Sequence, residues 1–201
     1  MDPIGELVNV FKKFPGIGTK SARRIAFYLL KKDKQELVNL GRMIATLKND
    51  LYKCKYCGNI SNSDPCPICK DPLRDKKILC VVEDIESLSA FEQAGIYNGL
   101  YHVLGEHISP FDGHDISDEC LDFLIEHIKK LGEAEIIIAT NPVMEGELTF
   151  YAIVNAIKDS GVKFKKISRI ASGIPIGGSI EFADKITLHT ALDGRTQIKL
   201  D

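Results

Sequence analysis

The stretch AEIIIATNPVMEGE, residues 134–147, combines a short apolar run with two glutamates that are separated by one residue. The run EIII predicts a strand of the kind that lies buried in a sheet. Glu145 and Glu147 follow the end of this strand, a placement that suits metal-assisted phosphoryl chemistry. The sequence therefore raises the question of whether the chain cuts or joins a substrate.

Apolar strands alternate with helical segments on both sides of this stretch. The predicted strands are KILCVVE (77–83), GLYHVLG (99–105), AEIIIAT (134–140) and KKISRI (165–170). The predicted helices are IESLSAFEQA (85–94), DECLDFLIEHIKKL (118–131) and ELTFYAIVNAI (147–157). This alternation predicts an α/β fold, with a parallel or mostly parallel sheet that helices cover.

The composition is that of a globular protein, with 44% hydrophobic and 27% charged residues among 201. This length allows one large domain, or a compact domain with a smaller module attached. No apolar run approaches the roughly 18 residues that a membrane span needs. The start, MDPIGELVNV, has neither the basic residues nor the small-residue cleavage site of a signal peptide. We therefore expect a cytoplasmic protein.

The net charge of −2 conceals an uneven distribution along the chain. Residues 1–56 carry twelve Lys and Arg against five Asp and Glu, a net charge of +7. The remaining residues carry fourteen against twenty-three, a net charge of −9. A basic portion joined to an acidic body indicates a polyanion-binding module on a separate domain. Ordinary solvated helix faces would give the same charges, so charge alone does not decide.

Two CxxC pairs with eight residues between them predict a metal site. The four residues are Cys54, Cys57, Cys66 and Cys69. Two such turns complete a tetrahedral shell of four sulfurs, which leaves no open position for water and makes the zinc ion structural. Disulfides are disfavoured in a cytoplasmic chain, and two matched pairs favour metal over redox chemistry. Cys80 and Cys120 fall on apolar positions and are predicted to be buried thiols.

The N-terminal portion predicts helices over residues 4–13, 19–32 and 35–50, with apolar residues at helical spacing. The first two are joined within FPGIGTKSARRIAFYLL (14–30), where Gly16 and Gly18 allow a tight turn with uncovered amides at the next helix start. Such amides favour phosphate. Lys20, Arg23 and Arg24 lie away from the apolar stripe, so the segment resembles the helix-hairpin-helix motif. A plain αα-hairpin with a solvated basic face is the alternative.

The positions of three glutamates in the predicted sheet also resemble those in a known domain. Glu83 ends the strand at 77–83, and Glu145 and Glu147 follow a later strand, an arrangement that looks like a Toprim domain. That fold serves topoisomerases, primases and some nucleases, where the acids hold magnesium. Strand-end carboxylates that are merely solvated would be the alternative, and spacing by itself favours it.

The order of modules closely resembles the RecR family of bacterial recombination mediators over essentially the whole chain. The matching motifs are PGIG with KSA, both CxxC pairs, VVE, GLYHVLG, ISPFDG, ATNP with EGE, and the tail SRIASGIPIGGSIEFADKITLHTALDGR. One departure is the loop 105–119, which Glu106, His107 and His114 make more polar. The implied modules are a helix-hairpin-helix module (1–53), a four-cysteine zinc knuckle (54–76), a Toprim domain (77–172) and a C-terminal oligomerisation segment (173–201).

The resemblance implies a non-enzymatic role in DNA repair. The family works with RecO and RecF to load RecA onto single-stranded DNA at gaps, as a tetrameric ring built from dimers, in the cytoplasm and at the nucleoid during repair. It implies binding of single- and double-stranded DNA by the hairpin. Lys20 and Arg24 are then the main phosphate contacts, and the secondary contacts are Arg23, Lys12 and Lys13. The acids Glu83, Glu145 and Glu147 would form a patch for a basic partner, with magnesium bound weakly.

The rival interpretation is a magnesium-dependent Toprim nuclease or primase-like enzyme that uses the same three glutamates. Two observations weigh against it. The chain reads Glu145-Gly146-Glu147 where Toprim enzymes typically carry two aspartates, and it has no spare domain to supply a nucleophile. An ATPase is disfavoured as well, because no GxxxxGK[S/T] loop occurs.

Overall fold

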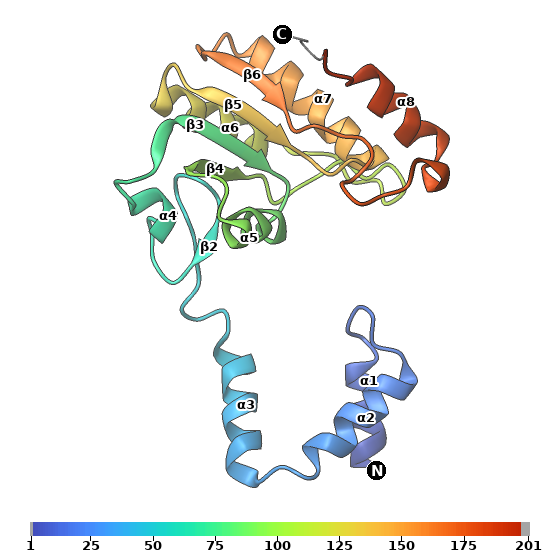
Figure 1. The fold of residues 1–201 in the computed structure, drawn as a ribbon. Helices are drawn as coiled ribbons and strands as arrows, with labels where there is room; N and C mark the ends of the chain where they lie inside the picture. The colour runs from blue at the N-terminus through green and yellow to red at the C-terminus, as the bar shows by residue number, and fades with distance from the viewer. Residues whose placement is uncertain (1, 198–201) are drawn as a thin grey trace. The chain divides into compact units, whose positions relative to one another are not determined.

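The computed structural model describes residues 2–197, which form two compact units divided after Leu51. Residue 1 and the end of the predicted C-terminal segment, residues 198–201, lie outside this described part. Figure 1 shows the helical unit in blue and the α/β unit in green to red.

The helical unit contains α1 (Pro3–Phe11), α2 (Thr19–Leu29) and α3 (Lys34–Thr46). Helices α1 and α2 pack against each other as a hairpin around Val8, Ala22 and Ala26. The two alanines add almost no side-chain bulk, which lets the helix axes approach closely. Asp2 caps α1 and Asp33 caps α3 by accepting hydrogen bonds from first-turn amides.

Helix α3 differs from what its apolar pattern predicts. The spacing of Leu37, Leu40, Ile44 and Leu47 predicts a stripe that packs on a core. The helix forms, but none of its residues is buried, and Ile44 and Leu47 are 66% and 65% exposed. The physical reason is that α1 and α2 bury their apolar faces on each other. Helix α3 therefore keeps an uncovered apolar face within its unit.

The α/β unit begins with a small knuckle. Strand β1 (Tyr52–Lys53) pairs antiparallel with β2 (Ile60–Ser61), and helix α4 (Pro67–Lys70) follows. The strands are only two residues long. A ladder this short cannot fold unaided, so another interaction must hold the knuckle together.

A four-stranded sheet forms the centre of the α/β unit. Its strands are β3 (Asp75–Val82), β4 (Gly99–Val103), β5 (Glu135–Ala139) and β6 (Lys166–Arg169). Their order is β4-β3-β5-β6, and every neighbouring pair is parallel. The helices that connect them are α5 (Ile85–Ala94), α6 (Asp118–Leu131) and α7 (Met144–Asp159). The predicted α/β class with a parallel sheet is confirmed.

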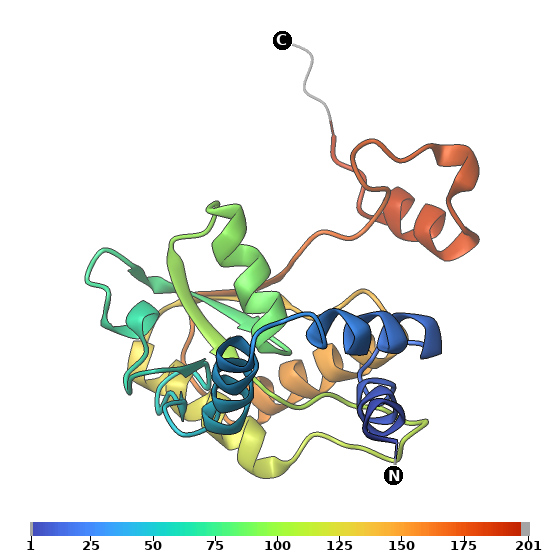
Figure 2. The ribbon, with the colours of Figure 1, turned by 90° about the horizontal axis from the view of Figure 1, so that it is seen from below.

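The pleat of the sheet separates two apolar cores. Leu79, Val81 and Ile138 face α6 and α7, where Leu124 and Ile153 are fully buried. On the opposite face, the alternate strand residues Cys80, Val82 and Tyr101 pack with Leu88 of α5. Both faces are therefore covered, as a parallel sheet requires (Figure 2). Cys80 and Cys120 are both buried thiols, as their positions predict.

The C-terminal segment contains a short 3₁₀ turn (Ile180–Phe182) and α8 (Lys185–Asp193), which Asp184 caps through the amides of Ile186 and Thr187. Several of its large apolar side chains are exposed, among them Ile176, Phe182 and Ile186. No helix of residues 2–197 is long and apolar enough to cross a membrane.

A histidine pair lies inside the α6 side of the sheet. The Nδ1 atoms of His102 in β4 and His127 in α6 are 3.1 Å apart, and both side chains are buried. The His102 ring packs on Phe123, with the ring centroids 4.9 Å apart. Burial lowers the pKa of His102 well below its usual value and lowers the pKa of His127 to about 4. Both rings are therefore neutral near pH 7.

This pair predicts loss of stability in acid. The unfolded chain protonates a histidine near pH 6.5, whereas the folded chain protonates His127 only near pH 4. The unfolded state thus binds more protons within this window. The free energy of unfolding should fall as the pH drops from 6.5 towards 4, by about 3 kcal/mol from His127. Denaturant unfolding at pH 7 and pH 4.5 measures the change.

The control is His127→Leu, which removes the titrating ring from α6. Acid also weakens metal binding by cysteines, but it does so equally in both proteins. The variant should therefore lose less unfolding free energy than the parent between the two pH values. Equal losses would contradict the assignment.

Candidate functional site

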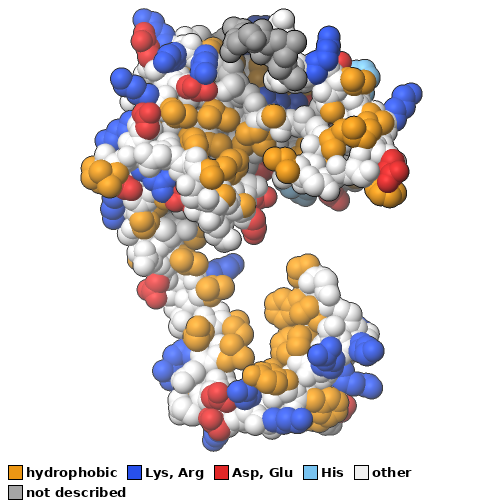
Figure 3. Space-filling view, viewed as in Figure 1, with side chains coloured by type: hydrophobic (Ala, Val, Ile, Leu, Met, Phe, Trp, Pro, Cys, Tyr) orange, Lys and Arg blue, Asp and Glu red, His pale blue; other side chains and the backbone are white. Residues whose placement is uncertain are grey.

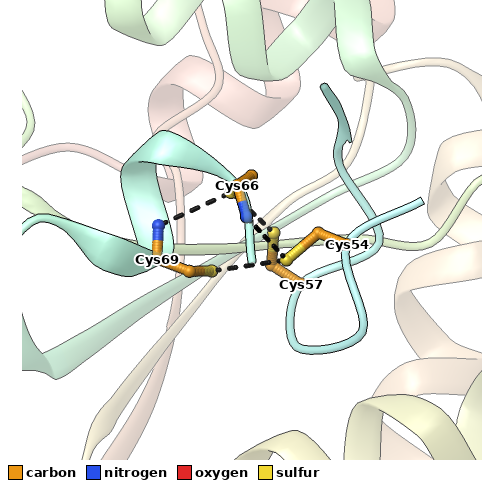
Figure 4. A group of neighbouring side chains, drawn as sticks. All are labelled: Cys54, Cys57, Cys66 and Cys69. Carbon is orange, nitrogen blue, oxygen red and sulfur yellow. Dashed lines mark hydrogen bonds between the residues drawn. The ribbon is translucent and has the colours of Figure 1, made fainter. Parts of the chain in front are cut away.

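The four cysteines of the knuckle converge on one point (Figure 4). Their sulfur atoms all lie within 4.8 Å of one another. The Sγ–Sγ distance is 3.6 Å between Cys57 and Cys66 and 3.9 Å between Cys54 and Cys69. Zinc held by four thiolates at about 2.3 Å sets sulfur–sulfur distances of about 3.8 Å in a tetrahedron. The four sulfurs therefore form a zinc-binding site.

The chemistry of the knuckle agrees with a closed structural site. The backbone amides of Cys66 and Cys69 donate to the sulfurs of Cys54 and Cys66. Such donors stabilise thiolates, which are the form that binds metal. Three of the sulfurs belong to buried residues, and all four ligands come from the protein. The predicted structural zinc site is confirmed.

The knuckle is fastened to the sheet at its first cysteine turn. The amide of Val103 in β4 donates to the carbonyl of Cys57 at 2.7 Å. Gly58 has φ of +75°, and a Cβ there would lie 2.5 Å from the Val103 carbonyl oxygen. Only glycine permits both this conformation and this approach. The metal ligands and strand β4 are therefore coupled through two backbone contacts.

The turn between α1 and α2 leaves the first-turn amides of α2 without a capping side chain. Gly16 has φ of +74°, and Gly18 is the residue before α2 with no side chain to cap it. The amides of the first turn have no carbonyl partner inside a helix. Their direction and the helix dipole favour an anion at this position.

Exposed cations surround this helix start (Figure 3, blue side chains over α1 and α2). The predicted DNA-contacting cations are all exposed: Lys12, Lys13, Lys20, Arg23 and Arg24. None of them forms an ion pair with the described residues. A hollow along α2 is lined by Lys20, Arg23 and Arg24 together with the rings of Phe27 and Tyr28. Cations and aromatic rings on one helix suit nucleic acid.

The three glutamates predicted for the strand-end site have different surroundings. Glu83 follows β3 and is 7% exposed. Its Oε2 accepts a short hydrogen bond from the Asn141 side chain, and its Oε1 is buried with no partner in the described part of the chain. Burial raises the pKa of Glu83. A Cβ on Gly146 would lie 3.0 Å from that Oε1 and would clash with the Asn141 carbonyl, so the glycine permits this packing.

The spaced pair lies on a helix and not in a loop. Helix α7 begins at Met144, so Glu145 and Glu147 belong to its first turn. Glu145 is half-buried. Both carboxylate oxygens of Glu147 accept hydrogen bonds from Arg169 of β6, one at 2.8 Å and one shorter. This ion pair lowers the pKa of Glu147.

The structure brings Glu83 and Asn141 together but does not join the three glutamates as a metal site. Among residues 2–197, the four cysteines are the only group of His, Cys, Asp or Glu whose ligand atoms could surround an ion. Glu147 is already engaged with Arg169. The polar loop 105–119 is ordered by its own contacts, since Glu106 accepts from the Ser117 amide and Ser109 pairs with His114.

Arg169 is the residue of this edge that the sequence pattern does not single out. It lies within the predicted strand KKISRI, where it resembles a neighbouring solvated cation. Its guanidinium lies over the Phe150 ring, 4.5 Å from the centroid. One signal was available, because a cation in the strand of a parallel sheet requires a carboxylate partner from a covering helix.

Four family models match successive parts of the chain. Family models match residues 4–48 (RecR, helix-hairpin-helix), 51–71 (RecR, four-cysteine zinc finger domain), 77–168 (Toprim domain) and 173–196 (RecR, C-terminal). Recombination protein RecR of Staphylococcus aureus strain MRSA252 is 42% identical over 197 residues, 98% of each chain. The same protein of strain Mu3 is 41% identical over the same extent. The chain thus belongs to the RecR family of recombination proteins.

Proposed function

We propose that this recombination protein is a DNA-binding mediator that helps RecO and RecF load RecA onto single-stranded DNA at gaps. The observation that carries the proposal is the uncapped start of α2 with its exposed cations, none of which pairs with an acid of residues 2–197. Phosphate contacts of this kind give affinity without sequence preference. That property suits a protein that acts wherever a gap occurs.

In this proposal the hairpin makes the DNA contacts. Lys20 lies in the first turn of α2, beside the free amides, and Arg24 lies one turn further on the same helix face. Arg23, Lys12 and Lys13 contribute secondary contacts. Gly16 and Gly18 keep the backbone near the phosphate free of side chains. Single- and double-stranded DNA both present this backbone, so both are ligands.

Two uncovered apolar surfaces support assembly into a ring. The first is the face of α3 with Ile44 and Leu47, and the second is the C-terminal segment with Phe182 and Ile186. Exposed apolar surface of this extent indicates contacts between chains. Two different surfaces allow a dimer as the building unit and a closed tetramer around DNA. The protein then acts in the cytoplasm, at the nucleoid during repair.

The acids at the carboxyl edge of the sheet form the partner surface in this proposal. Glu145 is half-buried on the first turn of α7, beside the exposed apolar residues Val143 and Met144. Acidic and apolar groups together fit a basic protein partner, for which RecO is the candidate. The protein is then not an enzyme. Cleavage would need a nucleophile or activated water at an assembled metal site.

The competing function is a magnesium-dependent Toprim nuclease or primase-like enzyme that uses Glu83, Glu145 and Glu147. One observation favours it, since the buried Oε1 of Glu83 lacks a partner within the described residues. Against it stands Glu147, whose two oxygens are both bound to Arg169.

Glu145→Ala separates the two functions. If the acids bind a partner, the variant should bind RecO about tenfold more weakly, a loss of about 1.4 kcal/mol, and load RecA more slowly. Zinc content and oligomeric mass should not change. Titration with purified RecO and a RecA-loading assay on gapped DNA measure both effects.

The matched control is Glu133→Ala, because Glu133 is an exposed glutamate just before β5, at the opposite edge of the sheet. It should bind RecO like the parent protein. Magnesium-dependent cleavage or primer synthesis by the pure protein, abolished by Glu83→Gln, would contradict the mediator function and support the enzymatic one.

A further inference from the structure

Arg169 pairs with Glu147, one of the three glutamates that a Toprim enzyme would use to hold a metal ion. Its Nη1 donates to Glu147 Oε2 at 2.8 Å, and its Nη2 donates to Oε1 at a shorter distance. Such a two-point contact neutralises the carboxylate and fixes both of its oxygens. We propose that Arg169 is the resident cation of the strand-end acids and that this edge binds no divalent ion.

The guanidinium is held firmly in this position. The ring of Phe150 covers it at 4.5 Å, and Phe150 comes from the same helix as Glu147. Arg169 itself comes from the last strand of the sheet, so the contact locks α7 onto β6. Cation–π contact and a paired carboxylate each favour the charged side chain at this position. Arg169 and Glu147 stabilise each other's ionised form, because Arg169 lowers the pKa of Glu147 and Glu147 raises the pKa of Arg169.

The remaining acids do not compensate for the loss of Glu147. Magnesium requires near-octahedral oxygen ligands at about 2.0–2.1 Å. Glu83 shares one oxygen with Asn141, is largely buried, and is held by packing against Gly146. With Arg169 bound to Glu147, its carboxylate and those of the other two glutamates do not converge as a ligand group within residues 2–197. Only release of Arg169 would free the two oxygens of Glu147.

This assignment has a consequence for any protein that docks at the edge. The charge of Glu147 is balanced by a side chain, so the electrostatics of the surface do not depend on the magnesium concentration. Contacts made there should persist in a chelator that spares zinc. The assignment concerns ion binding alone, so it stands or falls separately from the RecO contact proposed above.

Titration of the full-length, zinc-loaded protein with Mg²⁺ and Mn²⁺ tests the proposal. Isothermal calorimetry and Mn²⁺ paramagnetic resonance should detect no site in the parent protein at millimolar ion. Arg169→Gln should gain a Mn²⁺ site at least about tenfold tighter than any parent signal, because it removes the competing positive charge. Adding Glu147→Gln to that variant should abolish the gain.

Arg74→Gln is the matched control. Arg74 binds both oxygens of Glu92 in the same two-point geometry, at 2.8 and 2.5 Å, but away from the strand-end acids. Breaking this pair frees a carboxylate of the same kind with a single acidic neighbour, Asp71, whose Oδ2 lies 3.7 Å from the Nε atom of Arg74. The variant should therefore gain no Mn²⁺ site.

Two results would overturn the assignment. One is a divalent-ion site in the parent protein that Glu83→Gln or Glu147→Gln removes. The other is an Arg169→Gln protein with one zinc per chain and unchanged thermal unfolding that gains no Mn²⁺ binding. If Arg169→Gln does not fold, the parent titration decides the matter, since a site removed by Glu147→Gln refutes the proposal.

Discussion

Replacing Cys57 by Ser should release zinc and unfold residues 53–71, while most of the parallel sheet persists. Structural zinc contributes roughly 10–16 kcal/mol in small modules at neutral pH. The knuckle has little else to hold it, because β1 and β2 are two residues each and α4 is a single turn. Loss of one of four sulfurs therefore removes most of its folding free energy.

Metal analysis and amide hydrogen exchange measure this result. The parent protein, purified without chelator, should contain one zinc per chain, and the variant should contain far less. Exchange should rise over residues 53–71 and stay low in β3 and β5. The control is Cys120→Ser, since Cys120 is a buried thiol outside the knuckle that donates to the Leu104 carbonyl. Much less than one zinc in the parent would refute the site.

The double substitution Lys20→Ala and Arg24→Ala should produce the largest loss of DNA binding. Each phosphate contact releases counterions, so removal of two should lower the slope of log K against log salt by about two. Affinity should fall by about 10- to 100-fold at low salt, equally for unrelated sequences. Fluorescence anisotropy with single- and double-stranded oligonucleotides over a salt series measures both quantities.

The control for this pair is Lys129→Ala with Lys163→Ala, which removes the same charge from exposed positions of the α/β unit. Its salt slope should match the parent. If the hairpin variant keeps the parental affinity and slope, the α1–α2 hairpin is structural and the DNA contacts lie elsewhere.

Local signals made most of the fold predictable. The four parallel strands and their helices agree with the predicted segments because their apolar runs are long and bounded by glycine, proline or polar residues. The zinc site was predictable because its ligand spacing is a local property of two turns. The start of α7 was not. Val143 precedes it with no capping side chain, so the usual signal for a helix beginning is absent.

Contacts between distant segments explain what the sequence could not reveal. Glu147 and Arg169 lie 22 residues apart and meet only because α7 packs across β6. The apolar stripe of α3 was visible, but its exposure was not, because burial depends on what the neighbouring helices already cover. Charge and periodicity identify candidate residues. The tertiary fold decides which of them pair.

The contact between Cys57 and Val103 also affects the tendency of the protein to aggregate. Strand β4 lies at the outer edge of the sheet, where unpaired amides and carbonyls could template another chain. The Cys57 carbonyl accepts a hydrogen bond from the amide of Val103 in this strand. Gly58 packs closely against the carbonyl oxygen of the same residue. A chain that has lost zinc would uncover this strand. Loss of zinc should therefore promote aggregation through this strand.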